Sequence, residues 1–105
     1  MKQLIYMKSP CPPAQHGARL ARLTRHLNAR LLDFGPGGPE VLLCDSDQGM
    51  VAARFPGHET AQVISGLEAR GFLPSQVGDQ AVFYLSPEIR FEELDRLWGC
   101  LFELL

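Results

Sequence analysis

His58 and Glu59 are neighbours in the sequence, and a histidine beside a carboxylate could transfer a proton or bind a metal ion. The pair follows Pro56 and Gly57 at the start of a predicted helix, where adjacent side chains point in different directions. No other His, Cys or Asp stands at ligand spacing from them. We therefore interpret the pair as the beginning of the helix, with Glu59 placed favourably for the helix dipole.

The three cysteines are the next candidates for chemistry. Cys11 lies in a proline-rich turn before a predicted helix, a setting that can lower a thiol pKa and make it reactive. No base is close to Cys11 in the sequence, so an ordinary loop cysteine is the favoured interpretation. Cys44 and Cys100 fall on apolar faces and are expected in the core. The absence of a C-x-x-C pair argues against a zinc or redox motif and for reduced thiols.

Basic side chains recur along one predicted helix, at Arg19, Arg22, His26 and Arg30. Such a stripe could attract phosphates, as in nucleic-acid binding. However, the net charge of the chain is −2, and no aromatic residue alternates with the arginines to stack on bases. We therefore expect a solvated helix flank and no nucleic-acid partner.

Other polar residues are not arranged as a metal site. His16 and His26 belong to one predicted helix, but their spacing points them in different directions. Asp45 and Asp47 lack the ligand spacing and the closing glutamate of a calcium loop. The sequence thus predicts no metal-binding residues.

Length and composition are those of one domain. The 105 residues are 46% hydrophobic and 21% charged, which suits a globular chain that folds without disulfides or metal. The apolar residues near Lys2 and Lys8 are too few for a signal peptide, and no apolar run is long enough to span a membrane. We expect a soluble, cytoplasmic single domain over residues 1–105.

Hydrophobic periodicity predicts strands at 3–8, 40–45, 50–55 and 81–86, and helices from about 14 to the loop at 35–39, at 59–70 and from 91 to the end. Gly71 suits the left-handed position after the second helix, and 77–80 is interpreted as a turn. The order β-α-β-β-α-β-α predicts an α/β fold, namely a ferredoxin-like α+β sandwich with its helices on one face of the sheet.

A family pattern is present in residues 56–87 and in the segment EELDRLWGCLFEL, in the residues that end helices and strands and form turns. A helix ends in Gly-Phe, a polar turn with an aspartate follows, and an apolar strand ends at Ser-Pro. The matching positions are Gly57, Glu59, Gly71, Phe72, Asp79, Val82, Phe83, Leu85, Ser86 and Pro87. The pattern resembles the C-terminal region of pyridoxal-phosphate-dependent ornithine/lysine/arginine decarboxylases and, more loosely, the small domains of fold-type-I aminotransferases.

The N-terminal segment IYMKSPCPPAQHGARLARL is also similar to that family, in which a strand, Ser-Pro-Ser-Tyr and a long helix follow one another. Ser9 and Pro10 match, whereas Cys11 and Pro12 depart from the pattern. The resemblance implies that Ser9 would lie near a subunit interface and the cofactor edge.

Catalysis is not implied for this chain by itself. A pyridoxal enzyme needs a Schiff-base lysine and a large domain that holds the cofactor phosphate. The family has these upstream of the matched region, and neither Lys2 nor Lys8 stands in a comparable context. We therefore carry over no catalytic residue, no cofactor-binding residue and no cofactor.

The last predicted helix is apolar on several sides, through Trp98, Phe102, Leu104 and Leu105. Such a surface must be buried within the fold or in an assembly. The leading hypothesis is therefore a non-catalytic assembly module that forms a homodimer. The alternatives are one subunit of a split pyridoxal-dependent enzyme, docked on a separate chain with the large domain, and a small-ligand regulatory domain of ferredoxin-like type.

Overall fold

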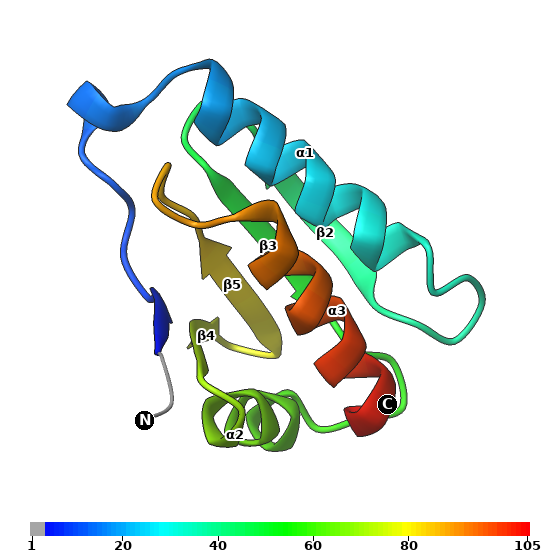
Figure 1. Cartoon of the computed structure of the whole chain (residues 1–105). Coiled ribbons are helices and arrows are strands. Elements are labelled where there is room, and N and C mark those ends of the chain that lie inside the picture. Colours follow the sequence, from blue (N-terminus) through cyan, green and yellow to red (C-terminus); the bar gives the residue numbers. More distant parts are fainter. Residues whose placement is uncertain (1–3) are drawn as a thin grey trace.

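A five-stranded mixed sheet and three helices make up the chain, of which this computed structural model describes residues 4–105 (Figure 1). The predicted residues Lys2 and Gln3 lie outside the described range. The elements are β1 (Ile5–Met7), a 3₁₀ turn (Pro13–Gln15), α1 (Ala18–Leu32), β2 (Glu40–Asp45), β3 (Met50–Arg54), α2 (Thr60–Ala69), β4 (Phe72–Val77), β5 (Gln80–Tyr84) and α3 (Phe91–Leu104).

Helix α1 begins later than predicted. The segment from about residue 14 is a separate 3₁₀ turn, and extended backbone at His16 and Gly17 interrupts it before the helix starts at Ala18. Leucines spaced three and four residues apart then place one fully buried face against the sheet, as the periodicity predicted. Thr24 lies within this buried face and satisfies its hydroxyl by donating to the Leu20 carbonyl, 2.7 Å away.

Strand β4 is the main correction to the predicted order of elements. Its first half pairs in parallel with β1, and its second half pairs antiparallel with β5. The turn predicted at 77–80 therefore shortens to residues 78–79 between β4 and β5. The observed order is β-α-β-β-α-β-β-α, and the strands lie in the order β1-β4-β5-β3-β2.

The helices all cover one face of the sheet. Alternate strand residues such as Val51, Phe72 and Phe83 point to this face and form one hydrophobic cluster with the buried residues of α1, α2 and α3. The prediction of an α/β fold with its helices on one face is confirmed, and the mixed sheet is compatible with a ferredoxin-like sandwich. Within residues 4–105, no helix covers the opposite face, which we call the uncovered sheet face.

Two further predictions concern turns and cysteines. Gly71 follows α2 with a φ of 93°, which confirms its left-handed role after the helix. Cys100 is partly buried against the core, as expected. Cys44 is exposed, so its prediction as a core residue is wrong, because β2 is an edge strand with β3 on one side only.

Candidate functional site

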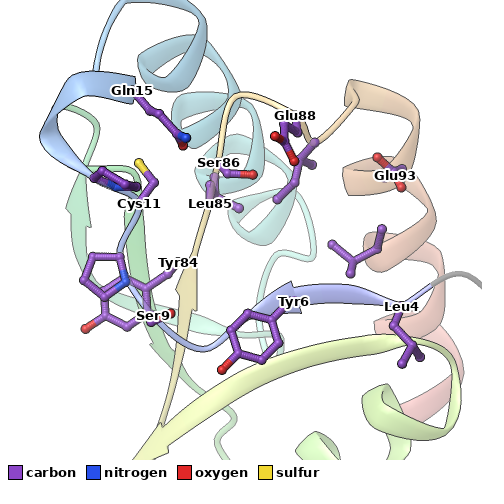
Figure 2. Close-up of a pocket in the computed structure, with 14 residues that line it drawn as sticks. Leu4, Tyr6, Ser9, Cys11, Gln15, Tyr84, Leu85, Ser86, Glu88 and Glu93 are labelled. Atoms are coloured by element: carbon purple, nitrogen blue, oxygen red, sulfur yellow. The ribbon is translucent and has the colours of Figure 1, made fainter.

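A cavity of about 420 Å³ lies between β1, the end of β5, the loop 86–90 and the first turn of α3 (Figure 2). The volume is within the range of small-molecule sites. Ile5 and Leu85 form part of its apolar wall, and the phenol rings of Tyr6 and Tyr84 stand at one side of it. The cavity is the candidate functional site of the chain.

The two Ser-Pro motifs of the sequence meet at this cavity. Ser9, Pro10 and Cys11 line it from the segment after β1, and Ser86 lines it from the segment after β5. Figure 2 shows Cys11 and Gln15 on one side of the cavity and Glu93 on the other, with Ser86 between them. Cys11 is thus partly buried at a cavity wall, in a place that its sequence context did not reveal.

Arg19 of α1 holds the loop that closes one side of the cavity. Its Nε donates to the Pro87 carbonyl at 2.6 Å, and its Nη2 donates to the Ile89 carbonyl at 2.9 Å. The Ile89 amide in turn donates to the Ser86 carbonyl, and the Ile89 side chain is buried. These bonds fix the loop without placing the guanidinium on the cavity wall.

Glu93 is the buried charged residue of the cavity wall, at 7% exposure. Its Oε1 accepts a hydrogen bond from the Arg90 amide at 2.9 Å, as a glutamate does in the first turn of a capped helix. Its Oε2 is buried and has no hydrogen-bond partner among residues 4–105. The geometry therefore leaves one carboxylate oxygen of the site unsatisfied.

The uncovered sheet face is the second notable surface. Strand pairing aligns Leu43, Ala52 and Val82 in one row across β2, β3 and β5. Leu43 is 50% exposed, and on the same face Tyr6 and Val77 are both 62% exposed. Ala52 and Val82 are themselves buried, so the exposed apolar side chains of this face lie on β1, β4 and the edge strand β2, while the opposite face carries the helices.

The predicted basic stripe is not only a solvated flank, because most of its members bind other parts of the chain. His26 Nε2 lies 2.8 Å from Oδ1 of Asp95, and Arg30 Nε donates to the same oxygen at 2.9 Å. The His26 ring also contacts the edge of Phe91. Sequence reasoning missed Asp95, because no local pattern links a carboxylate on α3 to bases on α1.

The remaining predicted residues stay apart from the cavity. Glu59 is the residue before α2, and its backbone carbonyl, not its side chain, accepts the first helical amides. His58 and Glu59 border a separate hollow of about 590 Å³ together with Asp79. The side chain of Lys8 is half exposed, and its Nζ lies 3.8 Å from Oε2 of Glu68. In the described part of the chain, no three His, Cys, Asp or Glu side chains gather as metal ligands would.

Cys44 has a perturbed thiol even though the residue is exposed. Partial desolvation of the sulfur raises the pKa of Cys44, the Asp45 carboxylate raises it further, and Arg25 opposes the rise. A raised pKa lowers the thiolate fraction, so exposure alone does not make this cysteine a nucleophile.

The apolar surface of α3 is mostly covered within the chain. Phe34 stacks on Phe102 at 4.3 Å between ring centroids, and Trp98 contacts Phe102 edge-on at 4.7 Å. Arg30 lies over the Trp98 ring, and Leu104 packs against the core. Phe102 remains 53% exposed, but the broadly apolar helix predicted from the sequence is largely satisfied by its own fold.

Comparison with solved structures identifies the fold. A glycine decarboxylase (P-protein) of the glycine cleavage system matches 83% of this chain at 24% identity, with a TM-score of 0.69. The lysine aminotransferase of M. tuberculosis matches 83% at 22% identity, with a TM-score of 0.66. A transaminase from an ancestral reconstruction matches 81% at 16% identity, with a TM-score of 0.64. No protein-family model and no curated protein matches the chain.

These neighbours are pyridoxal-phosphate-dependent enzymes of fold type I. The chain covers 21%, 21% and 22% of their lengths, so it spans about a fifth of the solved proteins that it matches. At these identities the likeness concerns the fold alone. About four fifths of the chain thus shares the fold of one part of these enzymes, in line with the expected aminotransferase-like small domain.

Proposed function

We propose that this chain is a non-catalytic assembly module, and that its partner is a second copy of itself. The observation that carries the proposal is the apolar edge strand β2 beside the uncovered sheet face. Leu42 is 38% exposed and Leu43 is 50% exposed on this strand, which has a neighbour on one side only. An edge of this kind offers unpaired backbone groups and apolar side chains to another strand.

A second copy suits this edge for two reasons. Two identical antiparallel edges can pair across a twofold axis, because each contributes the same donors and acceptors to the other. At one end of β2 the charge is compensated within the chain, since Arg54 Nη2 lies 2.9 Å from Glu40 Oε1. The Glu40 carboxylate therefore brings no unbalanced charge to a second copy.

Light scattering at increasing protein concentration tests the dimer. The expected mass rises from 11.7 kDa toward twice that value, and Leu43→Lys keeps the chain monomeric because it places a charge on the edge strand. Leu32→Lys is the matched control, since Leu32 is 58% exposed on α1, away from the sheet edge. A monomer at every concentration, or a dimer that Leu43→Lys leaves intact, would contradict the proposal.

The alternative function is a subunit of a split pyridoxal-dependent enzyme. The neighbours favour this alternative because each has the same fold within a chain about four times as long, of which this chain covers 21% or 22%. The uncovered sheet face would then pack on a separate chain that carries the catalytic lysine. The resemblance in residues 56–87 suggests an ornithine/lysine/arginine decarboxylase as the enzyme.

Co-expression with a chain encoded nearby that carries the lysine-bearing large domain tests this alternative. A stable complex with the absorbance of bound pyridoxal phosphate is expected, and Val77→Lys on the uncovered face should weaken it. A complex that forms equally well with Val77→Lys would place the contact elsewhere. If no complex forms while the chain dimerises by itself, the split-enzyme alternative fails and the homodimer stands.

A further inference from the structure

The proposed dimer does not explain why one carboxylate oxygen of Glu93 is buried without a hydrogen-bond partner in residues 4–105. Three buried side-chain polar atoms lack a hydrogen-bond partner in residues 4–105, namely Nε2 of His16, Oε2 of Glu93 and Nε1 of Trp98. Of these residues, Glu93 lines the cavity of about 420 Å³, and its side chain is more than nine-tenths buried. A buried carboxylate oxygen is unfavourable without a donor, and the cavity that Glu93 lines has room for one.

The charge of the cavity wall restricts the donor. Glu88 and Glu93 both line the cavity, whereas no Lys, Arg or His side chain among residues 4–105 does. Arg90 is near, but its Nε lies 3.8 Å from Oε1, the oxygen that already accepts a hydrogen bond, and its side chain is 63% exposed. The Arg90 guanidinium therefore pairs with Oε1 from the solvent side, whereas Oε2 has no hydrogen-bond donor among the described residues.

The rest of the wall suits the body of a small amine. Tyr6 and Tyr84 present aromatic rings, which attract cations as well as alkyl groups. Ile89 and Leu85 add aliphatic surface, and the volume of about 420 Å³ holds a ligand of a few carbon atoms with accompanying water. Because Arg19 fixes the loop through Pro87 and Ile89, the wall is formed before a ligand arrives.

We propose that this cavity binds a small aliphatic amine in its protonated form, with the ammonium group donating to Oε2 of Glu93. A carboxylate-bearing ligand is disfavoured, because no positive side chain of the described residues lines the cavity to meet it. The amine site is separate from the dimer contact, since Glu93 and the β2 edge belong to different parts of the fold.

Two-dimensional amide NMR of the isotope-labelled chain tests the proposal with three matched probes, n-butylamine, butan-1-ol and butyrate. Saturable shifts with butylamine alone are expected at amides of Tyr6, Ser86 and Glu93. Equal shifts with butanol would show that the apolar wall suffices, and binding of butyrate would show that the α3 N-terminus attracts anions. Either result would overturn the assignment.

Variants separate the role of Glu93 in amine binding from its role in folding. Glu93→Gln keeps an acceptor for the Arg90 amide but removes the charge, so butylamine binding should weaken about tenfold or more. Glu92→Gln is the control, because Glu92 lies in the same helical turn but its side chain is 77% exposed. Unchanged affinity in Glu93→Gln would refute the proposal.

A second variant covers the case in which Glu93→Gln unfolds the chain. Ser9 is exposed and lines the cavity, so Ser9→Phe should reduce the open volume without altering the core. Loss of butylamine binding in a folded Ser9→Phe chain is expected. Retention of the wild-type affinity would show that butylamine binds outside this cavity.

Discussion

Nε2 of His26 on α1 lies 2.8 Å from Oδ1 of Asp95 on α3, and Arg30 donates to the same oxygen. One carboxylate oxygen therefore joins two residues of α1 to a helix that lies far along the chain. Two members of the basic stripe, His26 and Arg30, thus hold α1 against α3.

Replacing Asp95 by asparagine should lower the free energy of unfolding by about 1 kcal/mol or less, because the charge-assisted bonds to His26 and Arg30 weaken in a half-exposed site. Asp33→Asn is the matched control, since Asp33 is 61% exposed and 3.9 Å from Arg30. Urea unfolding measures both variants. Equal losses of unfolding free energy in the two variants would mean that the contacts of Asp95 stabilise the fold no more than those of Asp33.

The Asp95 contacts also predict a dependence on pH. The hydrogen bond from His26 lowers the pKa of Asp95 below its ordinary value, Arg30 lowers it further, and partial desolvation opposes both. The folded chain therefore binds this proton more weakly than the unfolded chain, whose carboxyl has a pKa of about 3.9.

The stabilisation from Asp95 is then fully present above about pH 4 and is lost as the pH falls through the lower folded pKa. The difference in unfolding free energy between the wild type and Asp95→Asn should shrink from about pH 4 downward. Unfolding measured from about pH 5 to about pH 2 checks this. A difference that stays constant over that range would show that Asp95 titrates alike in both states.

Arg19→Gln should loosen the loop that closes the cavity. The variant loses the guanidinium bonds to the carbonyls of Pro87 and Ile89, and a loss of about 1 to 2 kcal/mol in stability is expected. Hydrogen exchange at the Ile89 amide should become faster. Arg22→Gln, an exposed position on the same helix, should leave that exchange rate unchanged. Equal exchange in both variants would show that Arg19 does not hold the loop.

Gly49→Ala tests the turn between β2 and β3. Gly49 has a φ of 76°, and an added Cβ would lie 2.6 Å from Cδ1 of the fully buried Leu20. Gly57 has a φ of 82° with open space around it, so Gly57→Ala isolates the backbone cost of about 1 to 2 kcal/mol. Gly49→Ala should lose about 1 to 3 kcal/mol more in thermal unfolding, because of overpacking. Equal losses would mean that Leu20 moves aside freely.

Helices and hairpin were predictable because their signals are local. The leucines of α1 repeat with the period of a helix, and the turn before Gly49 separates two apolar runs. Strand β4 was missed for the opposite reason. Pro74 lies within it and lacks an amide donor, so this segment is a strand only because β1 and β5 pair with its two halves.

The sequence by itself determined the fold class and the helical faces, and its turn residues predicted the likeness in fold to one part of pyridoxal-phosphate-dependent enzymes. Only the tertiary structure decided that Ser9, Ser86 and Glu93 share one cavity, and that Asp95 meets His26. The physical reason is the separation along the chain over which each effect acts. Periodicity and turn chemistry act between near neighbours in the chain, whereas cavities and ion pairs depend on how distant elements pack.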